Sequence, residues 1–147
     1  MSNAFSCAIR LLARREHGAY ELTTKLLKKG YLNQDVQDAL LECRRLGLQS
    51  DDRFVENVVR TRIRQGYGPT RIRRELQELQ IDGGLINNAL RHEQDNWLSH
   101  AFAVWQKKYK DEGELSYHAV QKQKQFLLYR GFSTDTINTL FKEIITI

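Results

Sequence analysis

The sequence predicts an all-helical protein built from three tandem three-helix repeats. Apolar residues recur at intervals of three and four along almost the whole chain, an interval typical of amphipathic helices. One such stripe comprises Leu98, Ala101, Phe102, Trp105 and Tyr109. Only one proline interrupts the 147 residues. No long segment alternates apolar and polar residues as a half-buried strand would.

An internal repeat is visible when the chain is compared with itself at offsets of 50 and 51 residues. Segment 26–31 aligns with 76–81 and with 127–132. We therefore expect Leu26, Leu76 and Leu127 to be equivalent buried positions. Stacked repeats share a core with their neighbours, so we expect an elongated, curved array of helices packed at right angles. The predicted repeats are residues 1–49, 50–94 and 95–147.

Helix limits follow from the residues that cap helices. Glycine allows the left-handed conformation that ends a helix, and the predicted C-terminal glycines are Gly30, Gly47, Gly66 and Gly131. Serine and asparagine accept hydrogen bonds from the first N–H groups of a helix, and the predicted N-caps are Asn33, Ser50, Ser116 and Ser133. The predicted helices lie near 6–15, 18–29, 33–46, 51–66, 69–79, 82–93, 96–109, 116–130 and 133–145.

Two connections carry further expectations. Residues 66–69 form a Gly-Tyr-Gly-Pro turn in which Pro69 suits the first turn of the next helix. This turn lacks the sequence context of a phosphate-binding loop, so we predict a structural corner that sets the angle between two helices. Residues 110–114 form a polar turn in the third repeat.

No catalytic or metal-binding constellation can be assembled from the sequence. The histidines are scattered over the three repeats: His17, His92, His100 and His118. Cys7 and Cys43 lack both CxxC spacing and a nearby histidine pair, and Cys43 falls on an apolar stripe typical of a core. Asp51 and Asp52 fall in a first helical turn, where they complement the helix dipole. We expect no enzyme activity, no metal and no cofactor.

The basic residues are more informative than the net charge of +5. Between residues 60 and 74 the chain has no acid and six arginines: Arg60, Arg62, Arg64, Arg71, Arg73 and Arg74. They flank the 66–69 turn, so two helix ends should bring them together. Arginine suits bidentate contact with phosphate or carboxylate. The alternative is a solvated face in which Glu56 pairs with Arg60 and Glu75 with Arg71.

The other repeats add candidate partner-binding or DNA-binding residues. These are Arg14, Arg15, Lys25 and Lys28 in the first repeat and Lys107, Lys108, Lys122 and Lys124 in the third. Nucleic acid and an acidic protein surface both remain candidate partners. Four aromatic residues could stack on bases, but their spacing favours core packing: Trp97, Trp105, Tyr109 and Tyr129. A helix-turn-helix interpretation is weak, because helical repeats produce similar patterns freely.

The hydropathy of the chain argues against a membrane protein. Mean hydropathy is −0.57, and apolar runs fall far short of the ~20 residues that span a bilayer. The N-terminal residues lack the charged and apolar regions of a signal peptide. Two cysteines without a disulfide pattern fit a reducing compartment. We expect a cytoplasmic protein, and a monomer because no dimerisation heptad is present.

Several motifs resemble the RecX family of recombination regulators. Residues 12–17 (LARREH) resemble the family's opening, and residues 50–54 (SDDRF) its entry to the second repeat. The most distinctive stretch is residues 66–76 (GYGPTRIRREL). The third repeat adds Trp97, residues 107–109 (KKY) and residues 124–133 (KQFLLYRGFS). The resemblance extends over roughly residues 8–142.

This resemblance implies a bacterial cytoplasmic modulator of the RecA recombinase with no catalytic site of its own. Members of the family bind in the helical groove of the RecA–single-stranded-DNA filament. They typically inhibit strand exchange, ATP hydrolysis and co-protease activity. The implied processes are homologous recombination, DNA repair and the SOS response. The residues alone leave a second interpretation open: a helical module that binds single-stranded or structured DNA independently of RecA.

Overall fold

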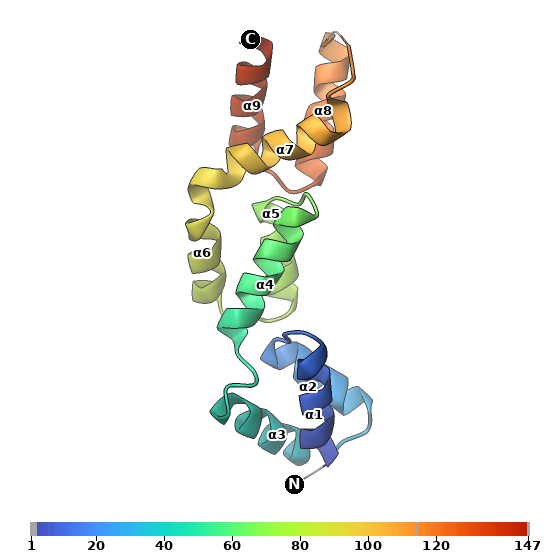
Figure 1. The fold of residues 1–147 in the computed structure, drawn as a ribbon, viewed down its shortest axis with the longest axis vertical. Coiled ribbons are helices and arrows are strands. Elements are labelled where there is room, and N and C mark those ends of the chain that lie inside the picture. The colour runs from blue at the N-terminus through green and yellow to red at the C-terminus, as the bar shows by residue number, and fades with distance from the viewer. Residues whose placement is uncertain (1–2, 114, 147) are drawn as a thin grey trace. The chain divides into compact units, whose positions relative to one another are not determined.

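The computed structural model describes residues 3–113 and 115–146, and these residues form helices and connecting turns without a strand. The α-helices are α1 (Asn3–Arg14), α2 (Ala19–Lys28), α3 (Asn33–Arg45), α4 (Asp51–Arg64), α5 (Pro69–Glu78), α6 (Gly83–His92), α7 (Trp97–Tyr109), α8 (Tyr117–Tyr129) and α9 (Thr134–Thr146). A short 3-10 helix, η1 (Gln94–Asn96), precedes α7. The all-helical prediction is confirmed (Figure 1). Glu114, in the predicted polar turn, lies outside the described residues.

Two compact units divide the described chain. The first contains the described residues up to Val58 together with Leu76–Ile86, and the second contains Val59–Glu75 together with the described residues from Asn87 onward. The division therefore passes through α4, α5 and α6. The repeat limits 1–49, 50–94 and 95–147 remain a prediction.

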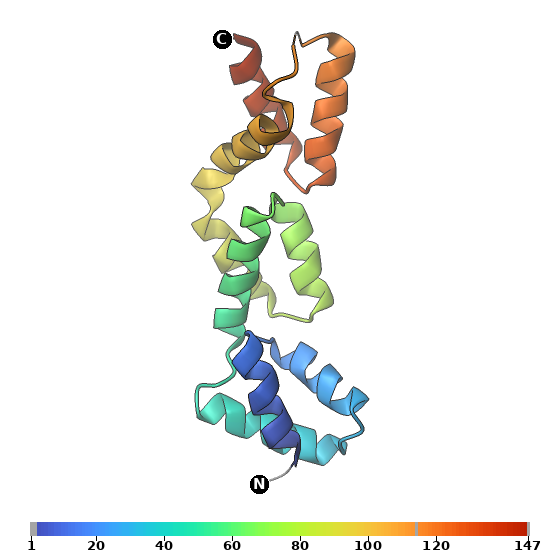
Figure 2. The same ribbon diagram turned by 45° about the vertical axis from the view of Figure 1, so that its right-hand side comes forward.

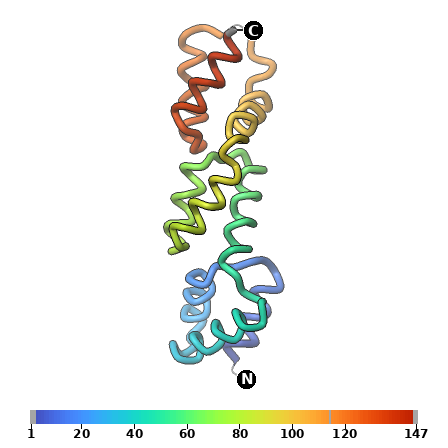
Figure 3. Tube along the Cα trace, turned by 90° about the vertical axis from the view of Figure 1, so that its left-hand side faces the viewer, coloured from blue at the N-terminus to red at the C-terminus, as the bar shows by residue number. Residues whose placement is uncertain are grey.

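The core of the first unit is formed by α1, α2 and α3. α1 packs against both α3 and α2, and α2 packs against α3 (Figure 3). Leu22, Leu26 and Val36 are completely buried there. Cys43 is also completely buried and is not part of a disulfide. Burial raises the pKa of its thiol, with a smaller contribution from Glu42, which confirms Cys43 as a core residue and makes it a poor nucleophile.

In the second unit, α7 packs against α9 and α8, and α8 and α9 lie side by side (Figure 2). Leu127 and Leu140 are completely buried between these helices. The Trp97 ring meets Phe132 edge-on at 6.5 Å between centroids. Where the core contains a polar group, that group is hydrogen-bonded: Trp105 Nε1 donates to the oxygen of buried Gln123 at 2.7 Å.

Most predicted helix ends agree with the structure. The predicted N-caps Ser50, Ser116 and Ser133 each accept a hydrogen bond from the N–H three residues on, at 3.3, 3.1 and 3.1 Å. Asn33 as an N-cap is wrong: α3 begins at Asn33, so the N-cap is Leu32. Positive φ occurs at all four predicted C-terminal glycines: Gly30, Gly47, Gly66 and Gly131.

The three leucines that align across the repeats are each 0% exposed, as the repeat predicts: Leu26, Leu76 and Leu127. The residue four positions after each leucine has positive φ. It is Gly30 or Gly131 after two of them and Gln80, with φ of 55°, after the third. Gln80 is the only non-glycine residue with positive φ in the described part of the chain. Because a side chain is strained in this conformation, Gln80 lowers the stability of its turn.

We expect Gln80→Gly to raise the free energy of unfolding by about 1 kcal/mol, because glycine adopts this conformation without strain. Thermal denaturation followed by circular dichroism measures the change. Gln37→Gly is the matched control: Gln37 is exposed inside α3 of the same compact unit, so glycine there should lower stability by about 1 kcal/mol. A loss of stability in both variants would contradict the strain assigned to Gln80.

A polar junction joins the α1–α2 connection to the start of α4. The Asp51 carboxylate accepts a hydrogen bond from the N–H of Ala19, the first residue of α2, at 2.8 Å. It also accepts from the Gln49 amide at 2.9 Å, and the same amide nitrogen donates to the His17 carbonyl at 3.2 Å. Asp51 therefore lies in the first turn of α4, as predicted, and also caps a helix 32 residues earlier.

The next residues of this segment extend the junction. Arg53 Nε donates to the Glu16 carboxylate at 2.7 Å, and Arg53 Nη2 donates to the Gly47 carbonyl at 2.7 Å. Phe54 is 3% exposed and lies against Gly18, where an added Cβ would come within 3.1 Å of the Phe54 ring. Most of the SDDRF motif is therefore accounted for by contacts within the first unit.

His17 is a buried, neutral part of this first unit. Its side chain is 2% exposed, with Nδ1 3.0 Å from the Arg15 carbonyl and Nε2 2.9 Å from Lys25 Nζ. These partners require a proton on Nδ1 and a lone pair on Nε2. Burial lowers the pKa of His17, the hydrogen bond to Arg15 opposes this, and the positive charges of Arg15 and Lys25 lower it further.

We expect acidification to destabilise the protein through His17. Above its ordinary pKa of 6.5, the ring is neutral in both states and its contribution does not change with pH. Below 6.5 the unfolded chain binds a proton that folded His17 resists, so the free energy of unfolding falls as pH falls. Urea denaturation between pH 7.5 and 5.5 should show a smaller fall for His17→Gln than for wild type. His118→Gln, at an exposed histidine, should behave as wild type; equal slopes for all three would refute the assignment.

Candidate functional site

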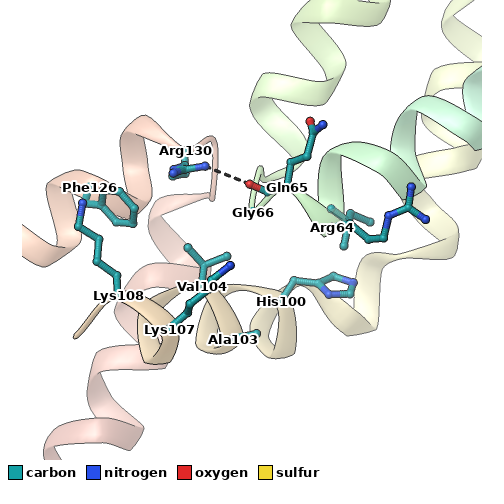
Figure 4. Close-up of a pocket in the computed structure, with 11 residues that line it drawn as sticks. Arg64, Gln65, Gly66, His100, Ala103, Val104, Lys107, Lys108, Phe126 and Arg130 are labelled. Carbon is teal, nitrogen blue, oxygen red and sulfur yellow. Dashed lines mark hydrogen bonds between the residues drawn. The ribbon is translucent and has the colours of Figure 1, made fainter. Parts of the chain in front are cut away.

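A basic pocket lies in the second compact unit, where α4, α7 and α8 approach one another. Four basic side chains line it: Arg64, Lys107, Lys108 and Arg130. Its volume is about 420 Å³, and no described residue lining it carries a carboxylate. Figure 4 shows that these side chains come from three separate elements. The pocket therefore concentrates positive charge from distant parts of the sequence.

Each of these cations lies at the C-terminal end of a helix. Arg64 ends α4, Lys107 and Lys108 lie in the last turn of α7, and Arg130 directly follows α8. A helix C-terminus carries partial negative charge that stabilises a nearby cation, which accounts for each residue separately. This effect of the helix dipole does not explain why three such helix ends meet at one pocket. The excess positive charge there suits an anion.

Arg130 is held at the edge of the basic pocket by polar and aromatic contacts. Its Nη1 donates to the Gln65 carbonyl at 3.1 Å, the bond that Figure 4 marks. Its guanidinium carbon lies 5.2 Å from the centre of the Phe126 ring and 4.9 Å from that of Tyr67. The guanidinium is thus positioned before any ligand binds.

These contacts are part of a longer series, which we call the aromatic–cation ladder. Its members alternate between cation and ring, in the order Lys108, Phe126, Arg130, Tyr67, Arg71 and Tyr129. At one end Lys108 Nζ lies 3.9 Å from the Phe126 ring centre. At the other, the Arg71 guanidinium carbon lies 4.1 Å from the Tyr67 ring centre and 6.0 Å from that of Tyr129. The ladder joins the basic pocket to Tyr129, which is 76% exposed.

The ladder is supported by direct contact between two turns. The Gly68 N–H donates to the Arg130 carbonyl at 2.8 Å, and the Thr70 N–H donates to the Gly131 carbonyl at 2.9 Å. Pro69 lies between these donors as the first residue of α5. A phosphate-binding loop presents its N–H groups to a ligand, whereas these N–H groups bond within the chain. The 66–69 turn is a structural corner, as predicted.

The remaining arginines of the 60–74 cluster have different surroundings. Arg62 forms an ion pair with Glu75 at 2.7 Å, and the hydrogen bond to Glu75 raises the pKa of Arg62. The alternative pairing of Glu75 with Arg71 is therefore wrong. Arg73 donates to the Asn87 side-chain oxygen at 2.7 Å. Arg60 and Arg74 are exposed.

The predicted residues of the first repeat belong to the first compact unit, and none of them lines the basic pocket. Arg15 forms an ion pair with Glu21 at 2.6 Å, and Lys25 contacts His17 as described. Burial alone would raise the pKa of Glu21, but the hydrogen bond from Arg15 and the charges of Arg15 and Lys25 hold it below its usual value. Arg14 and Lys28 are exposed.

Lys122 and Lys124 belong to α8 of the second unit but do not line the basic pocket. Lys122 is exposed, and Lys124 Nζ donates to the Asn138 side chain at 3.5 Å. Of the predicted cations, the pocket brings together Arg64, Lys107 and Lys108, while Arg71 joins the ladder. Sequence reasoning missed Arg130. The sequence feature that could have identified Arg130 is its position between an aromatic residue, Tyr129, and the helix-ending glycine Gly131.

One aromatic prediction is corrected by the structure. Trp97 and Tyr109 are each 8% exposed and belong to the core, as expected. Tyr129 does not, with three quarters of its surface exposed. It follows buried Leu127 by two residues, which turns it about 200° around the helix axis, to the opposite face of α8.

The described residues, 3–113 and 115–146, contain neither a membrane-spanning helix nor a cluster of metal ligands. No helix in these ranges has the length and apolar character needed to cross a membrane. No group of three or more histidine, cysteine, aspartate or glutamate side chains in the same ranges could hold a metal ion.

Comparison with protein families gives three consecutive matches. Residues 4–43 match the model of the RecX first three-helix domain. Residues 50–90 match the second domain, and residues 94–141 match the third. The matches extend over most of the chain and occur in the family's order.

Individual relatives agree with these matches. A regulatory protein RecX from Legionella pneumophila (strain Corby) is 54% identical over 144 residues, covering 98% of this chain and 96% of the relative. One from Pseudomonas entomophila (strain L48) is 40% identical over 133 residues, covering 90% and 86%. The crystal structure of RecX from Lactobacillus salivarius matches with a TM-score of 0.82 at 23% identity, covering 98% and 96% of the two chains. The structural match supports the fold.

Proposed function

Because the chain belongs to the RecX family, we propose that it is a non-enzymatic regulator of the RecA recombinase. In this proposal it binds the RecA–single-stranded-DNA filament and modulates, mostly by inhibition, its recombinase, ATPase and co-protease activities. It acts in the cytoplasm, as a monomer, in homologous recombination, DNA repair and the SOS response. The 54% identity to a regulatory protein RecX over nearly the whole chain carries this proposal.

The basic pocket is the part of the molecule that best fits such a role. A nucleoprotein filament presents phosphates and carboxylates, and both are anions that arginine and lysine bind. The pocket offers four cations without a described carboxylate among its lining residues. This excess of positive charge suits a regulator that binds an anionic filament.

The test is a time course of RecA ATP hydrolysis on single-stranded DNA, with the protein added below one molecule per RecA. We expect ATP hydrolysis to fall at these ratios, because a bound regulator that blocks extension or promotes disassembly affects many RecA subunits. Unchanged hydrolysis at every ratio would contradict the proposal.

A second candidate function is DNA binding independent of RecA, which the ladder and the pocket also favour. Binding measurements with labelled single-stranded DNA, with and without RecA, separate the two. Tight binding that requires the RecA filament supports the regulator, whereas equally tight binding to DNA alone, together with unchanged ATP hydrolysis, supports the second candidate.

A further inference from the structure

Tyr129 is an exposed aromatic residue whose position core packing does not explain. It ends α8, and its side chain lies on the face opposite the buried stripe that contains Leu127. Leu128 beside it is 48% exposed. Stacking of another flat group on a solvent-exposed aromatic ring is energetically favourable. Tyr129 is therefore available to a ligand with a flat face.

The surroundings of Tyr129 are cationic. The Arg71 guanidinium carbon lies 6.0 Å from its ring centre, and the ladder continues through Tyr67 to Arg130 at the basic pocket. The ladder contains no carboxylate, and neither do the described lining residues of the pocket. A ligand that covers Tyr129 thus also meets several positive charges.

Single-stranded nucleic acid has both properties that this surface selects. Each nucleotide carries a flat base that stacks on an aromatic ring and a phosphate that pairs with arginine or lysine. An acidic peptide would satisfy the cations but would leave the Tyr129 ring without a stacking partner. The combination of ring and cations therefore favours nucleic acid over an acidic protein surface.

We propose that Tyr129, the aromatic–cation ladder and the basic pocket form one binding site for single-stranded nucleic acid. A base stacks on the Tyr129 ring, and the adjoining backbone phosphates are held by Arg71 and by the cations of the basic pocket. This inference deepens the proposed function and rests on it for the identity of the strand, the DNA within the filament. The inference adds a direct contact with the bases, whereas charge alone would hold only the phosphate backbone.

The test measures fluorescence anisotropy of two labelled strands of equal length, oligo(dT) and an abasic strand with the same phosphates. We expect Tyr129→Ala to weaken oligo(dT) binding fivefold or more, a loss of about 1 kcal/mol or more for one stacked base. Affinity for the abasic strand should be unchanged, because that strand has no base to stack. Tyr129→Phe keeps the ring and should bind oligo(dT) as wild type does.

Tyr117→Ala is the matched control, because Tyr117 is 81% exposed and lies at the other end of α8. It should bind both strands as wild type does. The site is overturned if Tyr129→Ala binds oligo(dT) normally, if it weakens binding to both strands equally, or if wild type binds neither strand. Displacement of oligo(dT) by poly-glutamate at matched charge concentration would also overturn it, in favour of an acidic protein partner.

The same preparations separate this inference from the proposed function. If wild type inhibits RecA ATP hydrolysis but Tyr129→Ala binds oligo(dT) normally, the stacking site is wrong and the regulator stands. If wild type leaves ATP hydrolysis unchanged while Tyr129→Ala loses only oligo(dT) binding, the stacking site stands and the regulator is wrong.

Discussion

Replacing Gly131 with alanine should lower the free energy of unfolding of the second unit by about 2–5 kcal/mol. Gly131 has φ of 101°, where a side chain introduces strain of about 1–2 kcal/mol. An added Cβ would also lie 2.7 Å from the Arg71 Cβ and 2.8 Å from the Arg71 backbone nitrogen, and such overpacking destabilises by about 1–3 kcal/mol. Thermal denaturation followed by circular dichroism measures the total.

Gly30→Ala is the control that isolates the strain. Gly30 is equivalent in the repeat and has φ of 95°, but no atom lies within 4 Å of an added Cβ. Alanine there should destabilise by about 1–2 kcal/mol only. Equal losses for the two variants would show that the close approach between the turns, as described, makes no contribution to stability.

Reversing two charges of the basic pocket should abolish most of the proposed regulation. In the double variant Arg64→Glu/Lys107→Glu, two exposed cations become anions that repel phosphate. We expect at least tenfold more protein to be needed for half-maximal inhibition of RecA ATP hydrolysis. The salt dependence of single-stranded DNA binding should weaken by about 0.7 in log–log slope for each phosphate that the variant no longer neutralises. The melting temperature should barely change, since exposed charges contribute little to stability.

The matched control is Arg10→Glu/Lys29→Glu, which makes the same change in net charge at two exposed positions outside the pocket. Inhibition by this variant should equal that of wild type. If both double variants lose inhibition to the same degree, net charge determines binding and the pocket has no special role.

The sequence was sufficient for the helices because their signals are local. Apolar spacing, serine caps and helix-ending glycines act within a few residues, so most predicted ends lie close to the observed ones. The errors are long-range. Asp51 was expected to act on its own helix, but it also caps α2, 32 residues earlier. The alternative interpretation of the arginine cluster pairs Glu75 with Arg71 of its own helix, but Glu75 pairs with Arg62 of α4.

The candidate site was only partly predictable for the same reason. Composition identifies Arg64, Lys107 and Lys108 as basic residues near helix ends, but it does not show that those ends meet. Part of the pocket is assembled by long-range main-chain bonds: those from Gly68 and Thr70 to the 130–131 backbone join the turn after α4 to the turn after α8. Such bonds join main-chain atoms about 60 residues apart, and a single sequence does not reveal them. Any residue can supply the carbonyl, and every residue except proline can supply the N–H.

In the candidate site, the main-chain contact between these two turns fixes the architecture, which we call the frame, and the side chains determine which ligand binds. The bonds that hold the two turns together join N–H and carbonyl groups of the main chain. Every residue supplies the carbonyl, and every residue except proline supplies the N–H. Side-chain identity matters to this frame chiefly at Gly68 and Gly131, where the backbones come closest. Pocket residues such as Lys107 can therefore be exchanged while the architecture stays fixed. Evolution, or a protein engineer, can retune the ligand preference of this surface one side chain at a time.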